Sequence, residues 1–215
     1  ATPLAKHYPY RTYAPRAKNY SVAIYSKYPI LKHSPLVYTS LSTKGYAKTS
    51  AQYADIALPF DTVRVLNVHL SSTGLQDQDM DVVHSRDELL ETGQFVLSKL
   101  AATDRNRGLQ ANHIVEWVKE SPHPVILVGD FNGVPGGNLY WRLLRQLDDP
   151  YILNGYGTMG SFEPLARRGL FFKIDWTMHS TDLHSKGQYI ENINLSDHRP
   201  LVTRFSPEPP TPQGD

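Results

Sequence analysis

Short apolar segments bounded by turn residues recur along the chain and predict β-strands. Four of them are rich in β-branched and aromatic residues: residues 20–25, 62–70, 125–128 and 171–178. Residues 125–128 read Val-Ile-Leu-Val and are apolar at every position. Such a run is typical of a central strand that is buried on both faces.

Apolar residues at helical spacing predict three helices between these strands. In residues 105–120, Ile114 and Val118 belong to a set of apolar positions that repeats with the helical period. Residues 87–100 and 139–147 are the other two candidates. Strands that alternate with helices favour an α/β or a layered α+β domain.

Length and composition fit one folded domain. The chain has 215 residues, of which 40% are hydrophobic and 20% charged. We expect a single domain over residues 1–205 and a disordered or extended tail over residues 206–215, which contain four prolines. No apolar run reaches the roughly 18 residues of a membrane span, and residues 1–10 lack the apolar core of a signal peptide. The absence of cysteine excludes disulfides, thiolate metal sites and cysteine nucleophiles.

The net charge of +1 hides an uneven distribution of charge. Residues 1–54 contain eight Lys or Arg, no Asp or Glu, and nine of the 13 tyrosines. A basic, tyrosine-rich stretch suits contact with phosphate-bearing partners, and Arg11 and Tyr13 within it are candidate substrate-binding residues. The same composition is equally typical of half-buried strands whose lysines face water, so both interpretations stay open.

The sharpest local feature is Gly129-Asp130-Phe131-Asn132, directly after the apolar strand 125–128. In an extended segment Asp130 and Asn132 point the same way, while Phe131 turns into the core. A carboxylate can hold a water or a cation, and an amide can donate to an oxyanion. Asp and Asn side chains also close turns, which is the structural alternative.

A carboxylate and an imidazole stand side by side in Ser196-Asp197-His198-Arg199-Pro200. Histidine exchanges protons near neutral pH, and a carboxylate suits a hard cation. The same pair would also cap a loop before the apolar residues that follow Pro200.

Two more candidates lie on predicted strands. His69 ends the strand 62–70, where a lone histidine is often structural. Asp175 lies inside an apolar strand, and a buried carboxylate needs a partner, commonly a histidine that it orients. Trp176 would either flank the site and contact substrate or be buried beside the sheet.

Together, and in this order, four motifs resemble the endonuclease/exonuclease/phosphatase superfamily, the fold of DNase I, neutral sphingomyelinases and inositol polyphosphate 5-phosphatases. The motifs are N-x-H-L at 67–70, G-D-F-N at 129–132, x-I-D-[YW] at 173–176 and S-D-H-x-P at 196–200. The resemblance covers about residues 8–205. It implies a DNase I-like four-layer αββα sandwich, in which two mostly antiparallel sheets are flanked by helices.

The resemblance also implies roles for five residues in a divalent-metal-dependent phosphoesterase. His198 would be the general base that activates a water, and Asp175 would orient it. Asp130 would position that water or help to hold the metal. Asn132 and His69 would stabilise charge on the phosphoryl oxygens.

Asp197 would belong to the cation site, where Mg²⁺ is expected and Mn²⁺ is the alternative, because carboxylate and amide oxygens suit a hard ion. The implied substrate bears a phosphate: a nucleic acid, a phospholipid headgroup or a sugar phosphate. The alternative is a non-catalytic domain of the same fold that binds anionic partners through its basic, tyrosine-rich N-terminal third.

The chain departs from the family pattern at its start. Members open with a strand that ends in Asn, followed by a Q-E motif whose Glu is the principal metal ligand, whereas the first carboxylate here is Asp55. The resemblance therefore implies an N-terminally truncated domain that lacks its first strand and helix. It also implies weak metal binding and little hydrolysis by this chain alone. A missing N-terminal segment would complete the fold and would be the place for a membrane anchor; the sequence leaves oligomeric state and compartment open.

Overall fold

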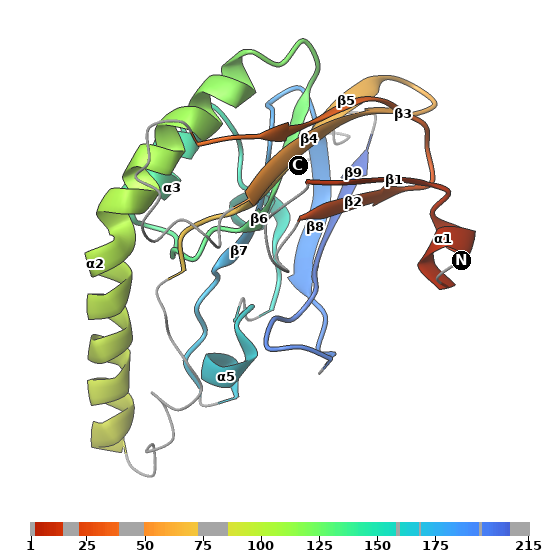
Figure 1. Ribbon diagram of the computed structural model, residues 1–215. Coiled ribbons are helices and arrows are strands. Elements are labelled where there is room, and N and C mark those ends of the chain that lie inside the picture. The colour runs from red at the N-terminus through yellow and green to blue at the C-terminus, as the bar shows by residue number, and fades with distance from the viewer. Residues whose placement is uncertain are drawn as a thin grey trace, which may run out of the picture.

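A five-stranded sheet forms the centre of the molecule (Figure 1). In this computed structural model the residues described are 3–14, 22–38, 50–72, 86–157, 160–167, 169–193 and 195–206. The central strands lie in the order β3-β4-β5-β6-β7, and β5 and β6 run parallel while the other neighbours are antiparallel. Their bounds are Ile30–Leu36, Ser50–Ala57, Thr62–His69, Val125–Asp130 and Asp175–His179.

One face of this sheet is covered by helix α2 (Arg86–Lys119) together with the short helix α3 (Asn138–Leu143). Their shared core contains residues that alternate along β5 and β6 and the apolar positions of α2. Its fully buried members include Leu66, Val68, Ala111, Ile114 and Leu127. Within the described part of the chain, no helix is both long enough and apolar enough to cross a membrane.

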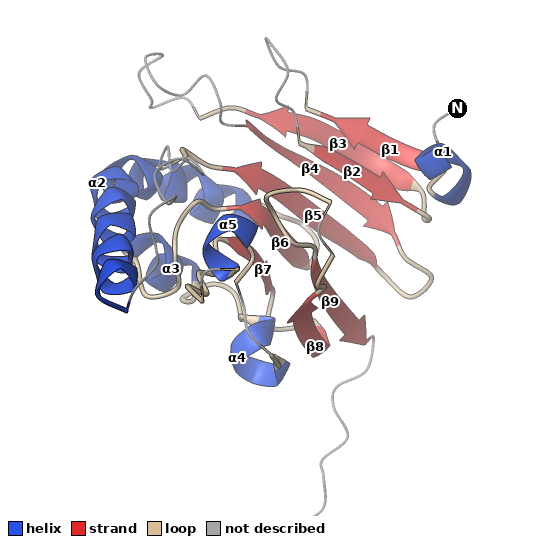
Figure 2. Ribbon diagram, turned by 90° about the horizontal axis from the view of Figure 1, so that it is seen from below, coloured by secondary structure: helices blue, strands red, loops and turns tan. Residues whose placement is uncertain are grey.

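Two separate ribbons lie on the other face of the sheet (Figure 2). Strands β1 (Tyr10–Tyr13) and β2 (Ala23–Ser26) contact β3 and β4, whereas β8 (His184–Ile190) pairs with β9 (Leu201–Ser206), which contacts β7. A second apolar core fills the space under the first ribbon and contains Ile24, Ala54, Ile56 and Val63. The fold is therefore a mixed α/β structure with a sheet between a helical layer and a strand layer.

The remaining helices are short: α1 (Pro3–His7), α4 (Pro150–Asn154) and α5 (Glu163–Ala166). Helix α4 packs against β8. Helix α5 packs near the start of β7, where Leu165 and Phe162 share a small core with Ile174 and with Val96 of α2.

The α/β prediction is confirmed, but several predicted elements differ. The two helices predicted over 87–100 and 105–120 are one continuous helix, because residues 101–104 contain two alanines and neither Pro nor Gly to end it. The helix predicted over 139–147 ends at Leu143. The second of the two predicted sheets consists, among the described residues, of two ribbons that are not bonded to each other.

The strand predicted over 171–178 begins only at Asp175. The preceding backbone bonds largely to Ser161, since the Ser161 N–H donates to the Phe172 carbonyl and the Ser161 hydroxyl accepts from the Ile174 N–H. On the other side, the Ile174 carbonyl accepts from the N–H of Phe131, just after β6. At the other end of the domain, β9 includes Ser206, the first residue of the predicted tail. Residues 207–215 lie outside the described residues, as do residues 20 and 21 of the first predicted strand.

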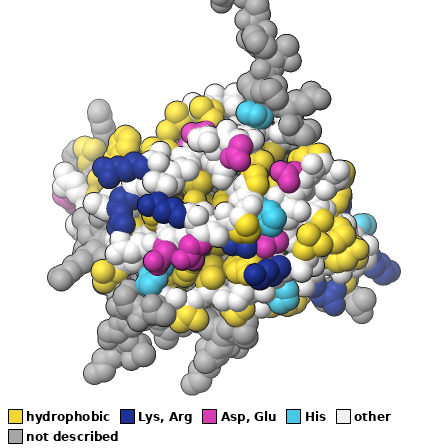
Figure 3. Space-filling model, turned by 90° about the horizontal axis from the view of Figure 1, so that it is seen from above, with side chains coloured by type: hydrophobic (Ala, Val, Ile, Leu, Met, Phe, Trp, Pro, Cys, Tyr) yellow, Lys and Arg dark blue, Asp and Glu magenta, His cyan; other side chains and the backbone are white. Residues whose placement is uncertain are grey.

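Charged side chains are mixed on the face seen from above. Figure 3 shows Lys and Arg, Asp and Glu, and hydrophobic side chains interspersed there. Among the residues coloured in that view, no continuous basic surface forms.

Candidate active site

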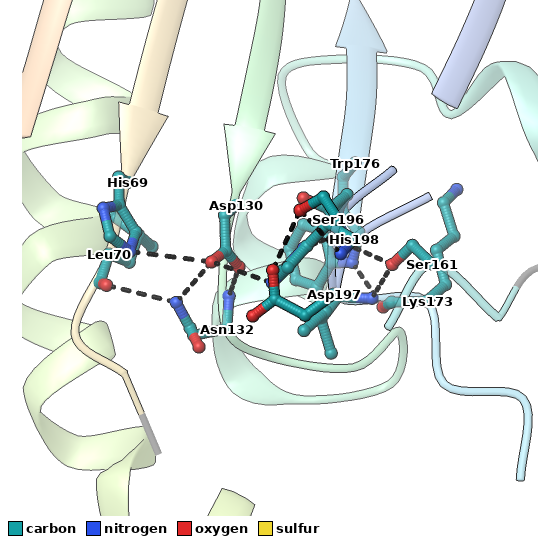
Figure 4. A network of polar contacts seen from close by, with 12 residues as sticks. His69, Leu70, Asp130, Asn132, Ser161, Lys173, Trp176, Ser196, Asp197 and His198 are labelled. Atoms are coloured by element: carbon teal, nitrogen blue, oxygen red, sulfur yellow. Dashed lines mark hydrogen bonds and ion pairs between the residues drawn. The ribbon is translucent and has the colours of Figure 1, made fainter. Parts of the chain in front are cut away.

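Three neighbouring strands deliver one polar side chain each to the same edge of the central sheet. His69 ends β5, Asp130 ends β6 and Asp175 begins β7, and the register places His69 opposite Asp130 and Asp130 opposite Asp175. Figure 4 shows His69 and Asp130 side by side at this edge. Because side chains alternate along a strand, the residue after each of these three polar residues turns towards the helical layer and is buried. These neighbours are Leu70, Phe131 and Trp176.

Gly129 allows β5 and β6 to approach closely just before Asp130. It adopts a positive φ of 143°, and a Cβ atom built there would lie 1.8 Å from the Val68 carbonyl oxygen. Any side chain would therefore force the two strands apart. The glycine of the G-D-F-N motif is thus required by the geometry that aligns His69 with Asp130.

His198 and Asp175 form a hydrogen-bonded dyad. The His198 Nδ1 lies 2.8 Å from Asp175 Oδ2, which assigns the Nδ1 proton to this bond. Nε2 then faces Asp130, whose Oδ2 is 4.0 Å away. Burial lowers the pKa of His198, but the hydrogen bond to Asp175 and the carboxylates of Asp175, Asp130 and Asp197 outweigh it and raise the pKa to about 9.

Asp130 occupies the centre of the group. Its two oxygens accept the backbone N–H and the side-chain amide of Asn132, both at 2.8 Å. The Nε2 of His69 lies 3.6 Å from its Oδ2. Burial and the nearby charge of Asp175 raise the pKa of Asp130 to about 7, against the lowering effects of His198 and Asn132.

The side chain of Asn132 contacts Asp130, but the backbone conformation that brings it there differs from the one expected. The predicted extended alternation is wrong at this position, since Asn132 has a left-handed φ of 49°. Its amide turns back onto Asp130 and also donates to the Leu70 carbonyl at 3.3 Å. Asn132 therefore joins the ends of β5 and β6 and fixes the Asp130 carboxylate. Contact with phosphoryl oxygens stays a prediction.

The donor atoms of the cluster fit a divalent cation. Asp130, Asp175 and His198 each offer one ligand atom, and these atoms lie within 4.8 Å of one another. The two carboxylates suit a hard divalent cation and an imidazole suits a borderline one, so the donor set fits a divalent cation without specifying which. Asp197 is outside this group: it is exposed and accepts the Ser196 hydroxyl at 2.9 Å, so its place in the cation site stays a prediction.

Trp176 is buried beside the sheet, which is one of the two interpretations that the sequence left open. Trp176 is only 1% exposed because strand alternation turns it towards the helical layer. Its ring stacks on Phe131 with centroids 4.4 Å apart, and its Nε1–H donates to the Lys173 carbonyl. Arg11 and Tyr13 are exposed on β1 and lie outside the cluster of Figure 4, so their contact with substrate stays a prediction.

Sequence reasoning missed Ser161. Its side chain is fully buried, and its hydroxyl oxygen accepts the backbone N–H groups of Ile174 and Asp175, each at 3.0 Å. A single serine in a loop carries no motif. Its position ahead of the Asp175 strand was the only available signal.

The comparisons with known proteins agree with this geometry. The sequence profile of the Endonuclease/Exonuclease/phosphatase family matches residues 1–198. The chain belongs to that family. No curated protein sequence matches it.

Solved structures share the fold of this chain at low identity. One is the family protein from Bacteroides vulgatus, with 16% identity, a TM-score of 0.71, and coverage of 95% of this chain and 78% of that one. Another is a mannosyl-6-phosphatase from Bacteroides thetaiotaomicron, with 15% identity, a TM-score of 0.59, and coverage of 91% and 77%. A third is sphingomyelinase C from Streptomyces griseocarneus, with 16% identity, a TM-score of 0.57, and coverage of 93% and 76%.

Proposed function

We propose that this family member hydrolyses a phosphoester with a water that His198 activates. The observation that supports this most is the His198–Asp175 hydrogen bond of 2.8 Å beside Asp130. It leaves Nε2 as the ring nitrogen that takes a proton when the imidazole is neutral, and it directs that nitrogen into the cluster. Because the pKa of His198 is raised to about 9 without a cation, the neutral base form requires alkaline pH or a bound cation that offsets the nearby carboxylates. A histidine that served only to cap a loop would not need a part-buried carboxylate behind it.

The proposed reaction uses three side chains in turn. Nε2 of His198 removes a proton from the water as its oxygen attacks phosphorus, and Asp175 stabilises the imidazolium that forms. The bond to the leaving oxygen breaks as the new P–O bond forms. His69, on the far side of Asp130, is placed to stabilise the charge that develops on a phosphoryl or leaving oxygen.

Asp130 would hold a divalent cation, and Asp175 and His198 would lie beside it. The family resemblance adds Asp197 as a further ligand of the cation. When bound, the cation would supply Lewis-acid stabilisation of the phosphoryl charge. The hydrogen bonds from Asn132 keep Asp130 in place for this purpose. Mg²⁺ is the expected ion because the cluster is rich in oxygen donors.

The substrate class is a molecule that bears a phosphomonoester or phosphodiester. Two proteins of similar fold are named for a phosphorylated mannose and for sphingomyelin, and both names describe phosphate-bearing substrates. A phospholipid headgroup, a sugar phosphate and a nucleic acid all fit this description.

The test is hydrolysis of bis-(p-nitrophenyl) phosphate with Mg²⁺ or Mn²⁺ by this chain and, in parallel, by any longer natural chain that contains it. The variant His198→Ala should lower kcat by about 10²-fold or more. His123→Ala is the matched control, because His123 precedes β6 at its other end, and it should leave kcat unchanged. Equal rates for the wild type and His198→Ala would contradict the proposal.

A second candidate function is binding of anionic partners without catalysis. It is favoured by the first ribbon, where Arg11 and Tyr13 are exposed and the Tyr13 hydroxyl bonds to the Tyr25 hydroxyl at 2.8 Å. The first 54 residues contain eight Lys or Arg and no acidic residue, a composition that suits anionic partners. Binding of a phosphate ligand without hydrolysis in every chain tested would favour this second function.

A further inference from the structure

We infer that Ser161 is a positioning residue that holds Asp175 and His198 where they can form their hydrogen bond. This inference rests on the proposed function, because it concerns the same site. The Ser161 hydroxyl oxygen accepts two consecutive backbone N–H groups, from Ile174 and Asp175. The side chain is fully buried, so no water replaces these bonds if the hydroxyl is lost.

The hydroxyl fixes the start of β7. Asp175 is the first residue of that strand and pairs with Asp130, so its backbone has a strand neighbour on the β6 side. Ser161 holds the backbone just before and at Asp175 by its own hydrogen bonds. The direction of the Asp175 carboxylate therefore depends on both β6 and Ser161.

The backbone around Ser161 holds the other member of the dyad. The Arg199 N–H donates to the Ser161 carbonyl at 2.8 Å, and the Glu163 N–H donates to the Asp197 carbonyl at 2.8 Å. Between these two bonds Phe162 forms a bridge with His198, and its ring lies edge-on to the imidazole with centroids 5.5 Å apart.

The three residues 161–163 thus join Asp175 and His198, which are 23 residues apart in sequence. Asp175 is held through the Ser161 hydroxyl, and His198 is held through the backbone on either side of it. Figure 4 shows Ser161 beside His198. A shift of either half would lengthen the hydrogen bond that orients the base. Misplacement of a catalytic group by about 1 Å can cost on the order of 10²-fold in rate.

The test compares Ser161→Ala and Ser161→Cys, which remove the strong acceptor, with Ser161→Thr, which keeps a hydroxyl. Ser180→Ala is the matched control, because the Ser180 hydroxyl also accepts a backbone N–H, from Val125 at 2.8 Å, at the opposite end of β6 and β7. Two quantities are measured on the full chain. One is the low-field proton resonance of the His198 Nδ1–H, and the other is kcat with KM.

We expect Ser161→Ala and Ser161→Cys to lose or shift the His198 proton resonance and to lower kcat by about 10- to 100-fold with little change in KM. Ser161→Thr should restore the resonance and most of kcat, and Ser180→Ala should change neither. An unchanged resonance and kcat in Ser161→Ala would overturn the inference. Failure of both the Ala and Cys variants to fold, with Ser180→Ala folded, would overturn it as well, because Ser161 would then serve folding alone.

The two proposals fail in different ways. If no chain hydrolyses any phosphoester, the proposed function is wrong, but the proton resonance still reports whether Ser161 holds the dyad. If hydrolysis depends on His198 while substitution of Ser161 changes neither the proton resonance nor kcat, only the positioning inference is wrong.

Discussion

Asp130 lies between the imidazoles of His69 and His198 and the carboxylate of Asp175. Its charge changes with pH, and the stability of the folded chain changes with that charge. Its pKa is raised from an ordinary value of 3.8 to about 7. The folded chain therefore binds more protons than the unfolded chain between these values. The stability from this group is fully present below about pH 4 and is lost as the pH rises through about 7.

The variant Asp130→Asn should therefore be more stable than the wild type in alkaline solution. An amide carries no charge to desolvate and does not repel Asp175, and its one oxygen can still accept one of the two hydrogen bonds from Asn132, while the other is lost. We expect the Tm of the metal-free chain to rise by about 3 °C or more near pH 8 and to change less near pH 4. Thermal unfolding followed by circular dichroism in EDTA measures this.

The exposed Asp182 provides the control, since Asp182→Asn removes the same charge outside the site. Excess Mg²⁺ should stabilise the wild type and not Asp130→Asn, because the cation binds only the folded chain with its carboxylate intact. A lower Tm for Asp130→Asn near pH 8 would show that the charge of Asp130 stabilises the metal-free fold.

The pairing of β5 with β6 sets the distance between His69 and Asp130, and Gly129 sets that pairing. We expect Gly129→Ala to destabilise the chain by about 3 kcal/mol or more and to abolish hydrolysis, because the new methyl group would overlap the Val68 carbonyl. The free energy of unfolding in urea measures the effect.

Gly136 is the matched control for Gly129. It also has a positive φ, of 98°, but an added Cβ would meet no atom within 4 Å. Gly136→Ala should therefore cost only the strain of the backbone, about 1 kcal/mol. If Gly129→Ala and Gly136→Ala lost equal free energy of unfolding, backbone strain, and not the close approach of β5 and β6, would explain the requirement for glycine at position 129.

Strands and helices that are marked by the sequence of the segment itself could be predicted. Segments whose structure depends on contacts with residues distant in sequence could not. The run Val125–Val128 is apolar throughout and is a central strand. By contrast, the backbone of residues 171–174 has the composition of a strand but bonds to Ser161, ten or more residues away. Composition does not record such a competing partner.

For the whole molecule, the order of four motifs predicted the family and the α/β fold, because each motif lies where a strand meets the site. The row of His69, Asp130 and Asp175 follows from strand ends that share one edge of a sheet. The turned-back amide of Asn132 could not be predicted, and the sequence left open whether Trp176 is buried. They depend on a left-handed residue and on which face of β7 meets the helices.

The central claim is that Asp175 orients His198 as the base for phosphoester hydrolysis. The most direct measurement is kcat of Asp175→Asn on bis-(p-nitrophenyl) phosphate with saturating Mg²⁺. This variant keeps the shape of the side chain but removes the charge that stabilises the imidazolium. We predict a loss in kcat of about 10²-fold or more with KM changed much less. A kcat equal to that of the wild type, in a folded Asp175→Asn chain, would contradict the account.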